Sequence, residues 1–264
     1  MRHKTTLRAS LAAGALALGL AVAGATPANA ATPLDDDFSS YTVGQKAEGT
    51  TFGNWTNVFD GARWNPDNTY TRGVTSIIQP GGVGTTKYLQ QSPPPALAPG
   101  QTFSSLTTSN ASFSGAYTLL AEYGNEVQLR QGSTPNPWER GWLLFNYTNN
   151  NSFVAVVLKT NGWQLSKEYT DPVDGSQREC FLATGTSPTY SLSSWKRVTV
   201  TQTVNASGQP TWVVQARTGS NALTTLTTYT DTGACGVTPY TSGKIGFYTE
   251  DAKLRWGWAR VTTP

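Results

Sequence analysis

Histidine is almost absent from this chain of 264 residues, and the one that occurs, His3, lies in an N-terminal segment that we expect to be removed. A chain without histidine cannot use imidazole as a base or as a metal ligand. Serine triads, histidine-based zinc sites and histidine-dependent lyase mechanisms are therefore excluded. Proton transfer is left to Asp, Glu, Tyr and Lys.

Long apolar runs are also missing outside the N-terminal segment, which has the features of a secretory signal peptide. Three basic residues, Arg2, Lys4 and Arg8, precede an apolar run at about 11–24, and a cleavage sequence of small residues follows at 28–30. The run is shorter than the roughly 20 residues that a membrane-spanning helix needs. We expect this segment to be cleaved, and the protein to be secreted to the extracellular space without a membrane partner.

The remaining chain, 31–264, lacks net charge. Three of the 19 Lys and Arg residues belong to the signal peptide, so 16 remain against 16 Asp and Glu. Without a net positive field or a long basic cluster, the electrostatic footprint of a nucleic-acid binder is missing. The length suits a single all-β domain, and the lack of coiled-coil segments favours a monomer.

Cysteine is scarce too, because Cys180 and Cys235 are the only two in the chain. In an exported protein a lone pair is expected to form a disulfide. Two cysteines without histidine are too few for a zinc site. A loop of this size contributes roughly 3–4 kcal/mol in the chain-entropy account of disulfide stability.

Helical periodicity is also missing from the sequence, and its absence indicates the fold class. From Phe103 onward short β-rich segments recur with turn residues between them, which is typical of a sandwich or barrel. We therefore predict an all-β sandwich of antiparallel sheets. Residues 171–190, which contain Cys180, are interpreted as a long loop.

The stretch 135–168 is organised around a predicted β-hairpin. Asn161-Gly162 separates two β-rich runs, which is a strong signal for a two-residue turn. This register pairs Lys159 with Gln164 and places both on one outward face with Glu168. The opposite face, which we predict to be core, carries Val154, Val156, Leu158, Trp163, Leu165 and Tyr169.

A second stretch, 122–130, alternates in the same way. Glu122, Glu126, Gln128 and Arg130 share one parity, and apolar residues share the other, as expected of a sheet with one side in the core. We expect this strand to join the sheet of the hairpin, so that the two form a polar groove. An ordinary solvated face fits the pattern equally well.

Several motifs resemble secreted concanavalin A-like β-sandwich proteins of soil actinobacteria. They are DDDFSSY at 35–41, PNPWE at 135–139, VLKTNGW at 157–163, LATGTSP at 182–188, YTSGKIGFYTEDA at 240–252 and the terminal ARV at 259–261. The wider fold group includes laminin-G-like modules, legume lectins, family 16 glycoside hydrolases and polysaccharide lyases. The resemblance implies a concanavalin A-like jelly-roll sandwich that acts on extracellular polysaccharide.

Three features depart from this group. No segment matches the E-x-D-x-x-E motif of family 16 hydrolases, and the histidine of alginate-lyase-like relatives is missing. Where many relatives carry a calcium-binding Asp in the last strand, this chain has Trp256-Gly257-Trp258-Ala259. Asp251 is the nearest late carboxylate. A structural calcium at Asp35, Asp36, Asp37 and Asp251 stays open, beside a solvated acidic N-terminus; no cofactor is required.

Paired carboxylates are the first candidate chemistry. Retaining glycosidases need two carboxyl groups about 5–5.5 Å apart and inverting ones roughly 6.5–9.5 Å. Glu122 and Glu126 lie four residues apart, about 13 Å along a regular strand, unless a bulge shortens the distance. Glu126 with Glu168 is a possible cross-strand pair. Glu139 is a further candidate, with a structural salt bridge as its alternative.

Elimination from a uronic-acid polymer is the second candidate chemistry. It needs a cation to neutralise the substrate carboxylate and a base to remove a proton. Arg130 and Lys159 could supply the charge, Gln128 or Gln164 a hydrogen bond, and Tyr147 the proton transfer.

A non-catalytic glycan-binding or cell-surface adhesion module needs neither chemistry, only aromatic rings and polar neighbours. Trp64, Trp138 and Trp142 are candidates for sugar stacking, with Arg140 beside them. We favour a polysaccharide-degrading hydrolase or lyase because the chain is larger than most binding modules.

Overall fold

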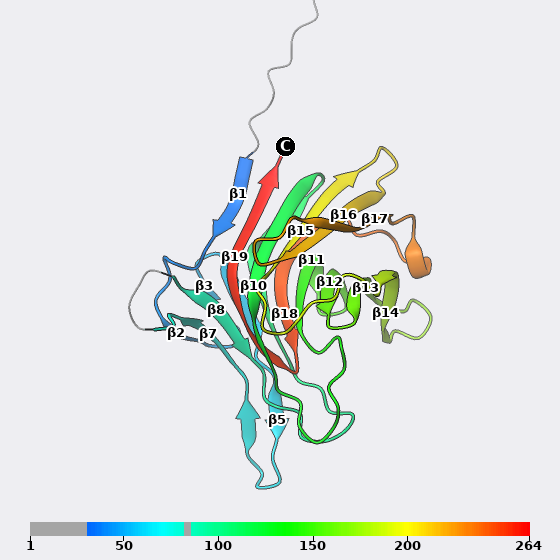
Figure 1. Cartoon of the computed structure of the whole chain (residues 1–264). Helices are drawn as coiled ribbons and strands as arrows, with labels where there is room; N and C mark the ends of the chain where they lie inside the picture. Colours follow the sequence, from blue (N-terminus) through cyan, green and yellow to red (C-terminus); the bar gives the residue numbers. More distant parts are fainter. Residues whose placement is uncertain (1–30, 82–85) are drawn as a thin grey trace, which may run out of the picture.

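The alternating segments form strands in the computed structural model, which describes residues 31–81 and 86–264 (Figure 1). The predicted signal peptide, 1–30, lies outside the described residues. The strands build two large antiparallel sheets, here named sheet A and sheet B. The predicted all-β jelly-roll sandwich is confirmed.

Sheet A contains the last long strand near its centre. Its order is β17 (Thr224–Thr230), β16 (Pro210–Thr218), β15 (Lys196–Val204), β10 (Tyr117–Gln128), β19 (Ala252–Thr263), β8 (Tyr88–Ser92), β7 (Val74–Ile78) and β2 (Gly44–Lys46), with β1 (Ala31–Asp36) also paired to β19.

Sheet B carries the predicted hairpin at one side. Its order is β14 (Gln177–Gly185), β13 (Gly162–Thr170), β12 (Ser152–Lys159), β11 (Gly141–Asn149), β18 (Ser242–Glu250), β9 (Ser104–Ser114), β4 (Trp55–Phe59) and β3 (Thr51–Phe52). A separate hairpin, β5 (Ala62–Trp64) and β6 (Tyr70–Arg72), projects from the body at the bottom of Figure 1. The 3-10 turn η1 (Ala234–Gly236) follows β17. Among the described residues, no helix has the length and apolar character needed to cross a membrane.

Aromatic rings fill the space between the two sheets. Phe247 of β18 stacks on Trp256 of β19 with ring centroids 4.2 Å apart, and on Trp55 of β4 at 4.6 Å. All three side chains are fully buried. This stack joins sheet B to sheet A. Each ring buries apolar area, and each ring pair stabilises the fold by a further amount of about 0.5–1.5 kcal/mol.

The hairpin has the predicted faces but another register. Lys159 pairs with Gly162 and Val157 with Gln164, so the turn is Thr160-Asn161 and the predicted pairing of Lys159 with Gln164 is wrong. Gly162 belongs to the strand: a Cβ there would lie 1.9 Å from the carbonyl oxygen of Gly185, and its φ is +136°. The slip is two residues, so no side chain changes face.

The core side of the hairpin was predicted correctly except at its end. Val154, Val156, Leu158, Trp163 and Leu165 all belong to the main hydrophobic core. Tyr169, at the strand end, is only half-buried.

Two other predictions of strand placement are wrong. Strand β10, which carries Glu122 and Glu126, lies in sheet A between β15 and β19, so it does not join the sheet of the hairpin. The segment 171–190, interpreted as a loop, contains strand β14, which pairs with β13 along its whole length. Both corrections change which carboxylates can meet.

Candidate functional site

Sheet B has a second apolar face, turned away from sheet A. On β11, Leu143 and Phe145 point into the core, whereas Trp142 and Leu144 belong to a separate cluster with Leu106. These apolar side chains form the floor of a cavity of about 460 Å³. Its lining residues are Phe59, Ser104, Leu106, Trp138, Trp142, Leu144, Asn150, Phe153, Gln164, Glu168, Gln177, Glu179, Phe181, Tyr248 and Glu250.

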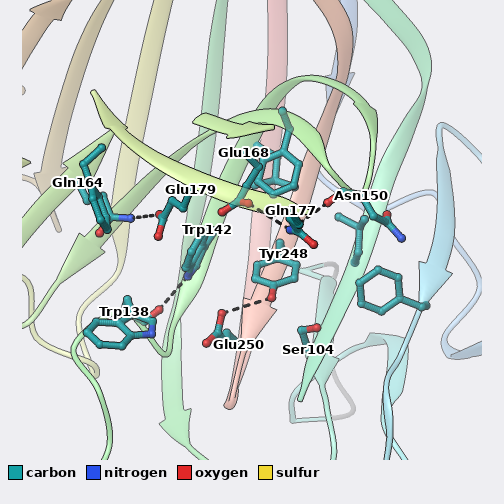
Figure 2. Close-up of a pocket in the computed structure, with 15 residues that line it drawn as sticks. Ser104, Trp138, Trp142, Asn150, Gln164, Glu168, Gln177, Glu179, Tyr248 and Glu250 are labelled. Atoms are coloured by element: carbon teal, nitrogen blue, oxygen red, sulfur yellow. Dashed lines mark hydrogen bonds between the residues drawn. The ribbon is translucent and has the colours of Figure 1, made fainter. Parts of the chain in front are cut away.

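Two carboxylates face this cavity from neighbouring strands. Glu168 on β13 is directly opposite Glu179 on β14 in the antiparallel ladder. Directly opposed residues have Cβ atoms about 4.5–5.5 Å apart and point to the same side of the sheet. Figure 2 shows both side chains directed into the same space. The register therefore places the two side chains next to each other on the cavity side of the sheet.

The environment of Glu168 favours its neutral form. Burial raises the pKa of Glu168 to about 7; a hydrogen bond from Gln177 opposes this shift and the charge of Glu179 adds to it. Gln177 Nε2 donates to Glu168 Oε2 over 3.1 Å. A carboxyl with a pKa near neutrality can give a proton at physiological pH, as a general acid requires.

Glu179 has more neighbours that stabilise its charged form than Glu168 has. It accepts a hydrogen bond of 2.6 Å from Gln164 Nε2. Partial burial raises the pKa of Glu179 above its ordinary value, and a hydrogen bond from Ser166 and the charge of Lys159 only partly oppose this shift. Lys159 Nζ itself lies 3.3 Å from Gln164 Oε1, and burial lowers its pKa. The pKa of both carboxyls is thus raised, and only Glu179 has a cation, Lys159, that opposes the shift.

A third carboxyl, Glu250 at the end of β18, forms the facing wall. Burial raises the pKa of Glu250 to about 7, helped by the charge of Asp251, whereas the Tyr248 hydroxyl bonded to it at 3.3 Å lowers it. The Tyr248 ring meets Trp142 edge to face, with centroids 5.3 Å apart. Glu250 is thus held by groups that also line the cavity.

Two of the aromatic residues that line the cavity are exposed, Trp138 and Phe181. Trp138, in the segment between β10 and β11, is 42% exposed. Its carbonyl accepts a hydrogen bond of 2.8 Å from Trp142 Nε1, which fixes the rim to the buried floor. Asn150 adds an amide at the other end, where its Oδ1 accepts from the Tyr147 hydroxyl at 2.7 Å.

The structure brings together only part of the predicted site. Glu168, Gln164, Trp138 and Trp142 line the cavity, and Lys159 lies beside it. Tyr147 is buried behind Asn150, where burial raises its pKa. It is not among the residues that line the cavity.

One group of predicted residues forms a buried ionic network instead. Arg130 Nε lies 2.7 Å from Glu139 Oε1, and its Nη2 lies 2.8 Å from Asp251 Oδ2. Gln128 Nε2 also donates to Glu139, at 3.2 Å. Glu139 is completely buried. Its salt bridge, weighed from the sequence as the alternative to catalysis, is present.

A second network holds Glu126. Its Oε2 binds Arg140 Nη2 and, at 2.5 Å, Lys196 Nζ, while Oε1 accepts from the backbone N–H of Gly141. All three charged side chains are buried. Glu126 lies on a strand of sheet A, so it does not form the predicted pair with Glu168.

Glu122 and Trp64 lie on other surfaces. Glu122 forms an ion pair with Arg197 on β15, within sheet A. Trp64 is 53% exposed on the projecting hairpin, where its ring packs edge to face on Tyr70 at 4.6 Å. Neither residue lines the cavity of sheet B.

The four carboxylates considered for calcium each accept hydrogen bonds from nitrogen donors. Asp35 binds Arg260 and Trp258, Asp36 binds Trp55, Asp37 binds the backbone of Ser39, and Asp251 binds Arg130 and the backbone of Phe103. Within 31–81 and 86–264, no group of three or more His, Cys, Asp or Glu side chains is placed to hold a metal ion.

Sequence reasoning missed Glu179, Gln177 and Glu250. Gln177, Arg178 and Glu179 are three consecutive polar residues, so no alternation with apolar residues marked this part of β14 as a strand. Glu250 alternates with the buried Thr249 at the end of β18.

The raised pKa values predict a stability that falls with rising pH. Glu168 and Glu250 shift from an ordinary value of 4.5 to about 7. A group that binds its proton more tightly when folded stabilises the fold below its unfolded pKa, and this contribution is lost as pH rises through the folded pKa. The melting temperature should therefore decrease between pH 4.5 and 7. The Glu168→Gln/Glu250→Gln double variant should flatten the curve in a thermal-shift series, and an unchanged slope would contradict the assignment.

Comparisons with known proteins agree only at the level of the fold. No protein-family profile and no curated protein match the sequence. A carbohydrate-binding module from Bacillus subtilis matches with a TM-score of 0.44 and 11% identity, over 77% of this chain and 91% of the module. An alginate lyase from Aplysia kurodai matches with a TM-score of 0.47 and 9% identity, over 72% of this chain and 87% of the lyase. An endo-β-1,4-glucuronan lyase from Trichoderma reesei matches with a TM-score of 0.45 and 12% identity, over 81% of this chain and 96% of the lyase. At these values the similarity transfers neither a ligand nor an activity to this chain.

Proposed function

We propose that this protein is a secreted glycoside hydrolase that binds an extracellular polysaccharide in the open face of sheet B. The observation that carries the proposal is the opposed pair Glu168 and Glu179, which faces a cavity with an apolar floor. Glu168, with its pKa near 7, is the general acid that protonates the leaving oxygen. Glu179 is the carboxylate that attacks the anomeric carbon.

The spacing of the pair favours retention of the anomeric configuration. Retaining enzymes place two carboxyl groups about 5–5.5 Å apart, whereas inverting enzymes leave room for a water molecule. Side chains directly opposite one another in an antiparallel ladder start from Cβ atoms about 4.5–5.5 Å apart. The second step is hydrolysis of the glycosyl-Glu179 ester by water, with Glu168 acting as the base.

The charge of the cavity argues against elimination from a uronic-acid polymer. Three lining residues are Glu, and none of the described lining residues is Lys or Arg. Lys159, the nearest cation considered, is bonded to Gln164 and interacts with Glu179. A substrate carboxylate would meet repulsion rather than neutralisation, so a polymer without acidic groups is the better substrate.

The test is incubation of the mature protein with a panel of neutral and uronic-acid polysaccharides. We expect new reducing ends from a neutral polymer, without the ultraviolet absorbance of an unsaturated product. Proton NMR of the first product should show retained configuration. Absorbance together with reducing ends would establish elimination and contradict the proposal.

A non-catalytic glycan binder is the alternative that Trp138 favours, because an exposed ring beside amide groups can stack on a sugar. Retention on a polymer without new reducing ends would support this alternative. Secretion is tested separately, by recovering the protein from culture medium and sequencing its N-terminus, which should begin at residue 31.

A further inference from the structure

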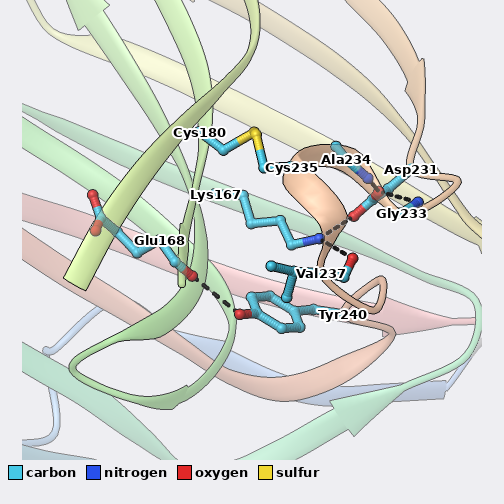
Figure 3. The surroundings of a disulfide bond; sticks show 9 residues. All are labelled: Lys167, Glu168, Cys180, Asp231, Gly233, Ala234, Cys235, Val237 and Tyr240. Atoms are coloured by element: carbon cyan, nitrogen blue, oxygen red, sulfur yellow. Dashed lines mark hydrogen bonds and ion pairs between the residues drawn. A yellow bond between two sulfur atoms is a disulfide. The ribbon is translucent and has the colours of Figure 1, made fainter. Parts of the chain in front are cut away.

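One segment, 231–240, contacts the core side of β13 and β14. It follows β17 and contains η1. Cys235 forms the disulfide with Cys180 of β14, as predicted from the sequence. Lys167 Nζ of β13 lies 2.8 Å from Asp231 Oδ2 and donates to the carbonyl of Val237 at 3.1 Å. The Tyr240 hydroxyl donates to the backbone carbonyl of Glu168 at 3.2 Å. Figure 3 shows these contacts converging on adjacent positions of the two strands.

The ion pair in this segment is completely enclosed. The side chains of Lys167 and Asp231 have no exposed surface, and Lys167 Nζ also lies 4.9 Å from the centre of the Tyr240 ring. The second oxygen of Asp231 accepts from the backbone N–H groups of Gly233 and Ala234 at 2.9 and 2.8 Å. Loss of either partner would leave an uncompensated buried charge, so the pair favours the arrangement in which both partners meet.

The segment is itself anchored to the other sheet. The backbone N–H of Asp231 donates to the carbonyl of Pro210, at the start of β16 in sheet A, over 3.0 Å. The segment therefore connects sheet A to the outermost strand of sheet B. Strand β14 is at the edge of sheet B, where β13 is its one ladder partner among the described residues.

The residue pair that the segment contacts and the pair of glutamates are consecutive in the ladder of β13 and β14. Lys167 is opposite Cys180, and the next pair is Glu168 opposite Glu179. Successive residues of a strand point to opposite faces. Lys167 and Cys180, which the segment contacts from the core side, are thus the immediate sequence neighbours of Glu168 and Glu179, which face the cavity.

We propose that segment 231–240 is a positioning clamp, which holds β14 against β13 so that the carboxyl groups of Glu168 and Glu179 keep their separation and Glu168 stays buried. Cys180, Cys235, Lys167 and Asp231 are its positioning residues. The catalytic consequence rests on the proposed hydrolase function, whereas the mechanical coupling does not.

The test measures the carboxyl pair directly. In protein with ¹³C-labelled glutamate, the Glu168 signal is assigned by its loss in Glu168→Gln and titrated by NMR. In the Cys180→Ser/Cys235→Ser variant we expect the pKa of Glu168 to move from about 7 toward its ordinary 4.5, because water reaches the carboxyl. Amide exchange along β14 should become at least about tenfold faster, while β10 stays unchanged.

Two controls keep the result interpretable. Val200→Ala removes methyl groups from the buried side of β15 and destabilises the fold without touching the clamp. Its melting temperature should fall while the Glu168 titration stays in place. Tyr240→Phe removes a single hydrogen bond and should fold normally, yet still speed exchange near Glu168. If the disulfide variant is not recovered folded, native protein reduced with a phosphine supplies the same measurement.

The outcomes separate the two proposals. An unchanged Glu168 titration and unchanged β14 exchange after disulfide loss would overturn the clamp. A shifted titration in a protein that cleaves no polysaccharide would support the clamp and overturn the hydrolase. If both hold, the basic limb of the pH–rate profile should move to lower pH in the clamp variant, which a purely global loss of stability would not produce.

Discussion

Replacing Glu168 by glutamine should lower kcat/KM for the polysaccharide by about 10²–10⁴-fold, the range that a positioned general acid contributes. The amide keeps the size of the side chain, and its one oxygen can still accept a hydrogen bond from Gln177, but it cannot act as an acid. Because Glu168 is a carboxyl held in an environment that disfavours its charge, its removal should leave the melting temperature equal or higher at pH 7 and above. The measurement is initial rates over a pH series, with thermal unfolding of the same samples.

Two comparisons make this prediction specific. An aryl glycoside of the same sugar has a leaving group that needs less protonation, so Glu168→Gln should lose much less activity on it. Asp67→Asn, a carboxyl-to-amide change in the exposed turn of the projecting hairpin, should leave both rates unchanged. Full activity of Glu168→Gln on the polymer would remove Glu168 from the role of acid.

Replacing Glu126 by alanine should destabilise the protein by about 3–5 kcal/mol, the cost of breaking a buried ion pair by removing one partner. Arg140 and Lys196 would remain side by side, with side chains 1% and 0% exposed, and without their common anion. Burial and the charge of Arg140 already lower the pKa of Lys196. The expected fall in melting temperature is roughly 6–20 °C for a domain of this size.

Urea unfolding checks the magnitude, and Glu122→Ala is the matched control. The Glu122–Arg197 pair is partly exposed, with side chains 31% and 25% accessible, and such pairs contribute about 0–1 kcal/mol. If the two variants lost nearly equal free energy of unfolding, burial could not be the reason for the large contribution of Glu126 to stability. A large effect confined to Glu126 would identify it as a structural residue, although its sequence context suggested catalysis.

The fold was readable from the sequence because its signals are local. Short β-rich segments with turn residues between them, and the absence of helical periodicity, depend only on neighbouring residues. The faces of the hairpin were readable for the same reason, since Trp163 and Leu165 alternate with Gln164 and Ser166. The disulfide followed from the presence of only two cysteines.

Strand partners were not readable, and the candidate site depends on them. Sequence spacing gives no information on whether β10 lies beside β15 or beside the hairpin, so Glu122 and Glu126 were assigned to the wrong sheet. The same limit applies to charge: an alternating Glu on a half-buried strand looks the same whether it faces solvent, as Glu122 does in part, or an enclosed Arg and Lys, as Glu126 does. Glu179 became visible only once β14 was known to be a strand.

The central position of β18 and β19 has a consequence for how the molecule is made. Strand β18 separates β11 from β9 in sheet B, and β19 separates β10 from β8 in sheet A. Both sheets therefore stay divided until residues 242–263 have been synthesised, and the Trp55–Phe247–Trp256 stack forms only then. Contacts between residues so distant in sequence form slowly. A ribosome-bound chain would therefore stay open through most of its synthesis.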